Sequence, residues 1–583
     1  MRAALCLALL SGAAWAHGGS TRSAPPVPTT GPQVVPVPGG TDSPSGRRGG
    51  PTTPIAATGK PHDWRTWWAY HREIFLGQRM RGKPKSGLEK LPDKRDERTE
   101  LRDDVILPIL LRALGDKHHR VRSAAAVALG KVGLPDADGA LKNHLTVRQE
   151  GWWDVRSGAI FGLGLLGDPG NRKTLLSMSR DKRREARERS MSYVGLLIDE
   201  SPKSGDELIY MLRQVAKSGA KSRGDAARFQ DKEELRRMQA HLVGFLDPQR
   251  FPVDSVLWAK IRSSKSSPAV RGLAVTALGR HGDAANTSQV FRLLSGIKQK
   301  REVRRSAAIA LGRLIQNDDE GRIRQLARIA RRDRDPVVQH FALMSLAWIG
   351  GELAGRALAD MAMDNTFGVV NDQLFLFLAL GIVDTNRARE TLMAEYEKAG
   401  NKDKRAVLAL ALGLARHDKA IPLTIKRLRK TSLAGGQGSD FLAFGALALG
   451  FHGRADGLDT VREVLRKYAH PRVREGATIG LVLLRGNRAA KELTEILLKS
   501  GSAAEANAAA AALGLLPEPP RPVIDALDRA WRQDSNRDGV RAAAVVALGA
   551  IGDLRTLPLS ARLIRHYNYF IRCLALDEIA TLL

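Results

Sequence analysis

Residue patterns that commonly support catalysis are absent from this sequence. It contains no His-Glu-x-x-His, Cys-x-x-Cys, Gly-x-Ser-x-Gly or Gly-x-x-x-x-Gly-Lys-Ser/Thr, the usual signatures of zinc proteases, thiol redox enzymes, serine hydrolases and P-loop enzymes. His118 and His119 are adjacent, so on a helix their rings point to different faces and chelate a metal poorly. Cys573 lies in an apolar stretch, where a packed thiol is expected. The sequence therefore predicts no catalytic residue, no metal ligand and no cofactor.

Arginine is the residue type best suited to binding chemistry in this chain, and one arginine recurs at a fixed place. It directly follows a valine or isoleucine at Arg122, Arg156, Arg271, Arg304, Arg474, Arg541 and Arg572. A row of guanidinium groups could bind an extended anion. Each arginine, however, stands at the start of a predicted helix, where it can bond to a turn carbonyl or to a carboxylate such as Asp154 or Asp335. We interpret this column as a structural ladder between repeats.

Further basic residues lie outside that column, and they are the candidates for binding an anion or a partner. They are Arg183, Arg184, Lys298, Lys300, Arg301, Arg331, Arg332, Lys426 and Arg427, together with Lys131, Arg280 and Arg313. The last three each follow a Leu-Gly step, so stacking of repeated helices could align their charges. The formal net charge of +30 favours an anionic partner such as a polysaccharide, lipid headgroups or nucleic acid. The alternative is that these charges only keep helix faces solvated.

The element that must position these residues is a short repeated helix, first clear at residues 121–133. Ala125, Val127, Leu129 and Val132 fall at helical spacings, and Gly133 can end the helix by taking a positive φ. Versions of this stretch recur with markers at positions 130, 164, 195, 244, 279, 312, 347, 381, 413, 450, 482, 514, 549 and 580. The separations are 31 to 37 residues with one gap of 49, which indicates a repeat architecture.

A second helical pattern lies between the markers, so each unit is a pair of antiparallel helices. Examples occur at residues 103–114, 321–330 and 489–498, and no segment shows the alternation typical of strands. One pair cannot bury its apolar stripe, whereas stacked pairs bury a continuous core. The sequence predicts an all-α fold, an α-solenoid of about 14 stacked pairs. At about 10 Å per pair the solenoid would be an arc of roughly 140 Å without a deep pocket.

This repeat resembles the HEAT family, especially the short variety called PBS-lyase HEAT-like repeats. The resemblance rests on Val-Arg-x-x-Ala-x-x-x-Leu-Gly-x-x-Gly, often followed by Asp, as at residues 270–283, and it covers residues 101–583. It implies an interaction scaffold rather than a defined activity. HEAT-built deoxyhypusine hydroxylases hold iron with His-Glu pairs, and this chain contains no His-Glu dipeptide. No motif of the bilin lyases can be matched residue by residue.

The residues before the repeats predict an exported protein. Arg2, the apolar run at 3–10 and the small residues around Ala16 are typical of a secretory signal peptide over residues 1–16. Residues 17–61 are rich in Pro, Gly, Ser and Thr and predict a disordered linker. Leader, linker and repeats together resemble exported bacterial HEAT-repeat proteins. We expect a periplasmic or extracellular location after cleavage behind Ala16.

Two further segments interrupt the simple pattern. Residues 62–100 contain a Trp-rich helix followed by a charged connector, and we expect this helix to cap the open end of the array. A polar and basic insertion at about 201–237 accounts for the gap of 49 residues and predicts a loop at the edge of the solenoid.

The leading prediction is a non-enzymatic, exported scaffold that binds a protein or an anionic polymer along the solenoid surface. One alternative is a PBS-lyase-like or other enzyme that uses the concave face. Another is a structural protein of the cell envelope. No stretch beyond the leader approaches eighteen uncharged apolar residues, so no transmembrane span is expected.

Overall fold

The computed structural model describes residues 63–81, 97–146, 148–198, 202–214, 226–367, 370–433, 438–533, 538–555 and 559–582. Within these ranges the regular structure is helical and no strand occurs, which confirms the all-α prediction. None of these helices is long and apolar enough to cross a bilayer. The signal peptide predicted over 1–16 and the linker predicted over 17–61 lie outside the described residues.

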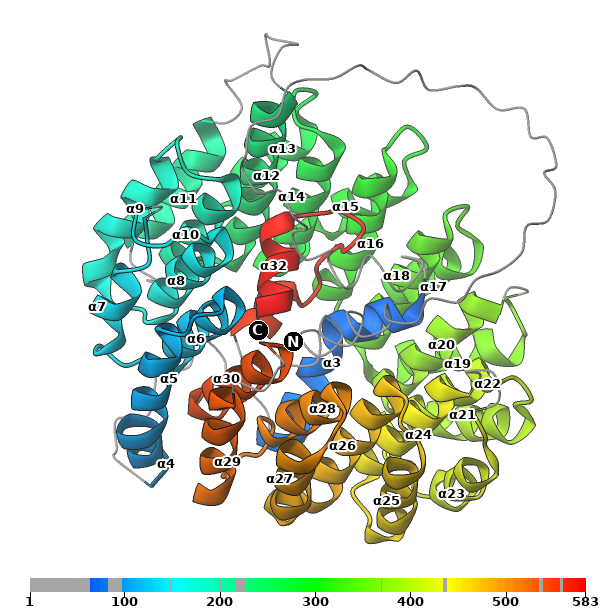
Figure 1. Ribbon diagram of the computed structural model, residues 1–583. Coiled ribbons are helices and arrows are strands. Elements are labelled where there is room, and N and C mark those ends of the chain that lie inside the picture. The colour runs from blue at the N-terminus through cyan, green and yellow to red at the C-terminus, as the bar shows by residue number, and fades with distance from the viewer. Residues whose placement is uncertain are drawn as a thin grey trace, which may run out of the picture.

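Thirteen pairs of antiparallel helices stand side by side in the described ranges (Figure 1). The outer helices are α5 (Leu107–Leu114), α7 (Ala137–Lys142), α9 (Arg172–Arg180), α11 (Pro202–Gln214), α13 (Asp254–Arg262), α15 (Thr287–Ser295), α17 (Glu320–Arg332), α19 (Gly351–Met363), α21 (Asn386–Lys398), α23 (Ala420–Lys430), α25 (Leu458–Lys467), α27 (Ala490–Lys499) and α29 (Arg521–Arg532). The inner helices are α6 (His119–Val132), α8 (Trp153–Leu165), α10 (Ala186–Ile198), α12 (Ala226–Leu242), α14 (Pro268–His281), α16 (Arg301–Leu314), α18 (Pro336–Ile349), α20 (Val370–Val383), α22 (Lys402–Leu414), α24 (Ser439–His452), α26 (Pro471–Arg485), α28 (Ala503–Leu513) and α30 (Asp538–Gly552). A short helix, α4 (Glu97–Glu100), and a π-helical turn, η1 (Leu101–Ile106), lead into α5.

Neighbouring inner helices touch through the Leu-Gly step. A Cβ added to Gly279 of α14 would lie 2.6 Å from the Cα of Ala310 on α16, which is closer than real side chains approach. The same holds for Gly381 of α20, whose added Cβ would lie 2.5 Å from the Cα of Ala411 on α22. In both cases the contacted alanine lies two positions before the next marker. Only glycine permits this close crossing, which explains why it recurs there.

The last pair packs on the first, so the solenoid closes into a ring (Figure 1). A Cβ on Gly549 of α30 would lie 2.4 Å from the Cβ of Ala128 on α6, which again lies two positions before a marker. Arg541 of α30 also forms an ion pair with Asp116, which precedes α6. The α-solenoid prediction is confirmed. The expected open arc of roughly 140 Å is wrong, because a small turn between successive pairs accumulates to a full circle.

The inner helices are covered on every side. In α24 all residues from Phe441 to His452 are buried, and the sequence is apolar around the whole helix. A helix of this kind needs apolar neighbours on all of its faces. The outer helices cover one side and adjacent inner helices cover the flanks. The side that faces the centre of the ring must therefore be covered by another part of the chain.

Helix α3 (Trp64–Arg81) crosses the centre of the ring and provides part of this cover (Figure 1). The rings of Trp64 and Phe444 have centroids 4.8 Å apart, and Arg72 forms a buried ion pair of 2.8 Å with Glu475. The Trp-rich segment therefore fills the centre of the ring. The sequence-based expectation that it caps an open end is wrong, because the closed array has no open end. The concave face, which the alternative of an enzyme would use, lies underneath it.

The C-terminal segment provides the rest of the cover. Helices α31 (Leu559–Ile564) and α32 (Leu574–Leu582) turn into the centre, where Tyr569 stacks on Tyr70 with centroids 5.2 Å apart. The carbonyl of Leu563 accepts a hydrogen bond of 2.8 Å from His241. The fourteenth copy of the repeat thus leaves the ring, and Arg572 does not stand at the start of an inner helix.

The insertion predicted as a loop over residues 201–237 is largely helical. It supplies α11 and the first part of α12. Residues 215–225 lie outside the described ranges. The polar composition of this stretch is that of an outer helix with one solvated face, which a loop prediction from composition alone misses.

Candidate functional site

The arginines of the repeated column bond within the array. The Nε of Arg271 donates to the carbonyl of Ile261 at 2.8 Å, and the Nε of Arg304 donates to the carbonyl of Leu294 at 2.9 Å, in each case ten residues earlier. The acceptors in the adjoining repeat are Gln299 for Arg271, Asp333 for Arg304, Glu150 for Arg122, Glu188 for Arg156, Glu505 for Arg474 and Asp116 for Arg541. These guanidinium groups tie neighbouring pairs together.

Three of the candidate binding residues also bond to a carbonyl or a carboxylate of an adjoining repeat. Arg184 donates to the carbonyl of Leu145 at 2.9 Å, across one repeat. Arg427 donates to two carbonyl oxygens at the end of α21 and lies 4.6 Å from the ring of Tyr396. Arg331 pairs with a carboxylate of the next repeat at 3.0 Å. These arginines contribute to contacts between neighbouring pairs.

Five other candidates are exposed at turns that connect an outer helix to its inner partner. They are Arg183, Lys298, Lys300, Arg301 and Arg332. Arg183 contacts Asp181 at 3.1 Å, whereas the side chains of the other four form no hydrogen bond or ion pair with a described residue. Basic residues favour the negative end of a helix dipole, and Arg332 lies at such an end. These charges are solvated along one edge of the ring.

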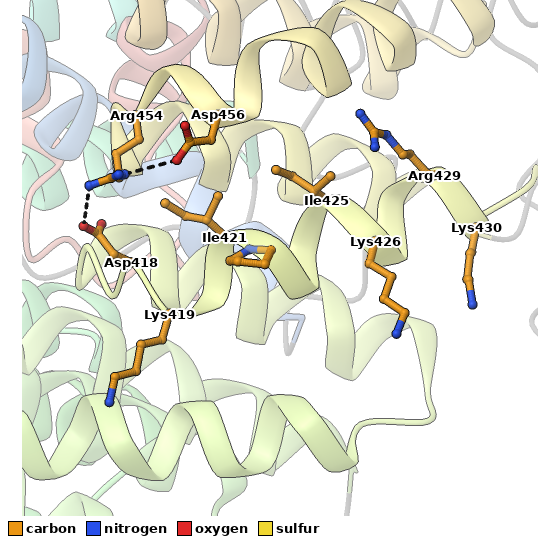
Figure 2. A pocket seen from close by; sticks show the side chains of 10 residues that line it. Asp418, Lys419, Ile421, Ile425, Lys426, Arg429, Lys430, Arg454 and Asp456 are labelled. Atoms are coloured by element: carbon orange, nitrogen blue, oxygen red, sulfur yellow. Dashed lines mark hydrogen bonds and ion pairs between the residues drawn. The ribbon is translucent and has the colours of Figure 1, made fainter.

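Lys426 belongs to a groove on the outer surface, which we call the α23 groove (Figure 2). Its volume is about 880 Å³, and it runs along one face of α23 toward the turn before α25. The residues that line it are Asp418, Lys419, Ile421, Pro422, Ile425, Lys426, Arg429, Lys430, Arg454 and Asp456. The isoleucines and the proline recur at helical spacing, so they form an apolar strip beside the charged side chains.

The charges of the α23 groove are unevenly paired. Arg454 contacts Asp418 at 3.3 Å and Asp456 at 3.4 Å, so at this end one guanidinium is shared by two carboxylates. Lys419, Lys426 and Lys430 are exposed and have no hydrogen bond or ion pair to a described residue. Figure 2 shows the three lysine side chains extending to the same side of α23. The groove therefore combines an apolar strip with an excess of positive charge.

The basic residues that follow a Leu-Gly step do not form one row. Lys131 on α6 is buried, and α8, α10 and α12 separate it from α14. Arg280 on α14 stacks on Phe245 at 4.3 Å and donates to the carbonyl of His241 at 3.2 Å. Arg313 on α16 is accessible to solvent, with no hydrogen bond or ion pair to a described residue.

Arg565 and His566, which follow α31, join Arg280 and Arg313 in what we call the central cluster. The Arg565 guanidinium lies 4.8 Å from the ring of Trp348. Burial and the nearby charge of Arg313 lower the pKa of Arg280 to about 9 and that of Arg565 to about 10. Burial lowers the pKa of His566 well below its usual value, and all three arginines lower it further. Sequence reasoning missed Arg565 and His566, because nothing in the repeat indicates that its last copy enters the centre.

Two family models agree with this architecture. A family model described as HEAT repeats matches residues 256–347, and one described as HEAT repeat matches residues 106–133. The chain contains HEAT repeats. A search of curated protein sequences finds no significant match to this HEAT-repeat protein. Among solved structures, one similar chain is human deoxyhypusine hydroxylase in complex with glycerol, with 16% sequence identity and a TM-score of 0.22. The similarity covers 54% of this HEAT-repeat protein and 96% of the hydroxylase chain.

Proposed function

We propose that this HEAT-repeat ring is an exported interaction scaffold that binds an acidic segment of a partner protein in the α23 groove. HEAT repeats provide helical scaffolds for protein interaction. The observation that supports this groove is the set of three unpaired lysines, Lys419, Lys426 and Lys430, beside an apolar strip. Export rests on the sequence pattern of residues 1–16.

The outer surface is the better candidate for binding because the inner surface is covered. α3, α31 and α32 lie against the centre-facing side of the inner helices. A partner that used this face would have to displace buried aromatic residues such as Trp64 and Tyr567. The α23 groove is open and needs no such rearrangement.

The chemistry of the groove favours a peptide that carries both carboxylates and an apolar side chain. Carboxylates would pair with the three lysines, and an apolar side chain would contact Ile425 and Pro422. Exposed ion pairs contribute about 0.2–1 kcal/mol each and weaken with salt. The apolar contact adds affinity that salt does not weaken. An anionic polymer, the other partner considered, would use the lysines alone.

The test is binding of a fluorescent peptide rich in Glu and Leu to the full chain, followed by anisotropy. The triple variant Lys419→Glu, Lys426→Glu, Lys430→Glu should bind about tenfold more weakly, which corresponds to three pairs of about 0.5 kcal/mol each. The matched control is Lys298→Glu, Lys300→Glu, Arg301→Glu, which makes the same charge change at exposed, unpaired positions outside the groove. Equal losses in both variants would contradict a specific groove.

A second variant separates a protein segment from a polymer. Ile425→Ser removes apolar contact area but no charge. It should weaken binding of the acidic peptide several-fold and leave binding of a sulfated polysaccharide unchanged. If only the polysaccharide binds, and the Ile425→Ser variant binds it normally, the partner is an anionic polymer. Export is checked separately: N-terminal sequencing of the secreted or periplasmic protein should begin at His17.

A further inference from the structure

The central cluster has positive charges but no described carboxylate to pair with them. No Asp or Glu among the described residues forms an ion pair or hydrogen bond with Arg280, Arg313 or Arg565. The pKa values of all three guanidinium groups are lowered by burial, and no carboxylate raises them. An exposed basic patch would not show this combination of burial and mutual repulsion.

Several nitrogen atoms of the cluster also lack a hydrogen-bond partner. The Nε atoms of Arg280 and Arg565 and the Nε2 of His566 are buried and have no acceptor or donor within reach. Buried polar groups are nearly always hydrogen-bonded in native proteins. Unsatisfied donors on two arginines, beside a third that solvent reaches, therefore point to a missing acceptor.

We infer that the centre of the ring binds a small oxyanion, a free phosphate or sulfate or a phosphate ester, between the guanidinium groups of Arg280, Arg313 and Arg565. The planar guanidinium fork matches the oxygens of such groups and can bond to two of them at once. Arg313 provides the solvent-facing side through which the anion enters. The inference is independent of the α23 groove, which lies on the outer surface.

The anion would also connect parts of the chain that are far apart in sequence. Arg280 and Arg313 belong to the inner helices α14 and α16, whereas Arg565 follows α31 in the C-terminal segment. Without an anion the guanidinium groups repel one another. An anion bound between them would attract all three, and would so hold the C-terminal segment to the inner helices. Bound anion should therefore stabilise the packing of the C-terminal segment as well as the whole protein.

The experiment is titration calorimetry and thermal unfolding of the full chain, after exhaustive dialysis into a chloride buffer. The probes are inorganic phosphate, sulfate, glycerol phosphate and, as a monovalent carboxylate, acetate. We expect saturable binding of at least one of the first three, at least tenfold tighter than acetate, and a rise in Tm with ligand concentration. Tighter binding of glycerol phosphate than of inorganic phosphate would identify an ester as the ligand class.

The variant Arg313→Gln tests the assignment without disturbing the core, since this side chain is accessible to solvent. It should weaken anion binding at least tenfold, and Arg313→Lys should restore part of the loss. Arg332→Gln, an exposed arginine with no described partner at the edge of the ring, is the matched control and should bind as the wild type does. The inference is overturned if no probe binds better than acetate, or if Arg313→Gln binds as tightly as Arg332→Gln.

Discussion

Two sets of arginines project from the inner helices of this ring, and they differ in what they contact. The ladder arginines stand near the helix starts, and Arg304, for example, bonds both to a carbonyl and to Asp333. The central arginines Arg280 and Arg313 stand near the helix ends and contact no described carboxylate. The ladder recurs because every pair must bond to the next. The central set has no such partner, so packing between pairs does not explain it. A buried arginine with a carboxylate partner thus indicates structure, whereas clustered arginines without one indicate a ligand.

The strongest test of this contrast removes a ladder arginine at the closure of the ring. Arg541 and Asp116 are both buried and join the last pair to the first. Arg541→Met leaves the carboxylate of Asp116 buried without a cation, and such losses cost about 3–5 kcal/mol. We expect a large fall in Tm and, because this contact closes the ring, an increased radius of gyration in solution scattering.

The matched control for that variant is Arg474→Met. It breaks the same kind of ladder contact, with Glu505, between α26 and α28 and not at the closure. It should lower Tm but leave the radius of gyration of the folded protein unchanged. Equal scattering curves for the two variants would show that the closing contact does not hold the ring together.

The second prediction concerns the glycine at the same closure. In Gly549→Ala the new Cβ would meet Ala128 at 2.4 Å, so α30 and α6 must separate. Overpacking of this kind costs about 1–3 kcal/mol. Gly139→Ala is the control, because no atom lies within 4 Å of its added Cβ and it stands inside α7. That variant should gain about 0.4–1 kcal/mol in chemical denaturation, and a comparable loss in both would rule out close packing as the cause.

The packing of one helix pair on the next could be predicted from the repeat, whereas the closure of the pairs into a ring could not. Val-Arg and Leu-Gly at 31 to 37 residue intervals specify inner helices that cross closely, as Gly279 and Ala310 do. The number of pairs that completes a circle depends on the small turn between pairs, which no single residue encodes. The apolar face of α3 indicated burial, but its partners exist only in the closed ring. The α-solenoid could therefore be predicted, and the filled centre could not.

The same distinction applies to the binding surfaces. Lys426 and Arg427 are neighbours in one basic run, yet Lys426 lines the α23 groove and Arg427 bonds to the carbonyls of α21. Successive helical residues point about 100° apart, so a charge run does not show which members are free. The central cluster needed Arg565, whose position follows from the inward turn of the last repeat. The sequence could identify the candidate basic residues, but only the structure shows which of them bond to a carbonyl or a carboxylate.

The third prediction concerns Arg565 of the central cluster, whose replacement should raise the free energy of unfolding. In anion-free buffer, Arg565→Met removes a buried charge that is repelled by Arg313 and has no described carboxylate partner. Stability should increase by about 1 kcal/mol, as found when buried charges give way to apolar groups of similar size. Arg541→Met should change stability in the opposite direction. In saturating phosphate the gain should disappear, and a loss of stability in both buffers would place Arg565 with the ladder.

The fourth and smallest effect comes from the acidic end of the same central segment. Burial raises the pKa of Glu578 to about 8 and that of Asp577 to about 7, so at pH 7 the folded protein holds Glu578 mostly protonated and Asp577 about half protonated. In the unfolded chain they ionise near pH 4, and the folded state therefore binds more protons between pH 4 and pH 8. By linkage their contribution to stability falls as pH rises through this window.

Buried histidines change the stability with pH in the opposite direction. His71 and His452 have pKa values lowered to about 4 by burial, so the unfolded state binds more protons below about pH 6.5 and stability falls as pH decreases. Above that pH the histidines no longer contribute, whereas Glu578 and Asp577 still do. The unfolding free energy should therefore decline by roughly 1 kcal/mol per pH unit from pH 7 to pH 8. Glu578→Gln cannot ionise and should flatten this decline in urea titrations. Glu320→Gln, on the exposed face of α17, should leave it as steep as in the wild type. A decline that survives Glu578→Gln unchanged would mean that the ionisation of Glu578 does not weaken the packing of the central segment.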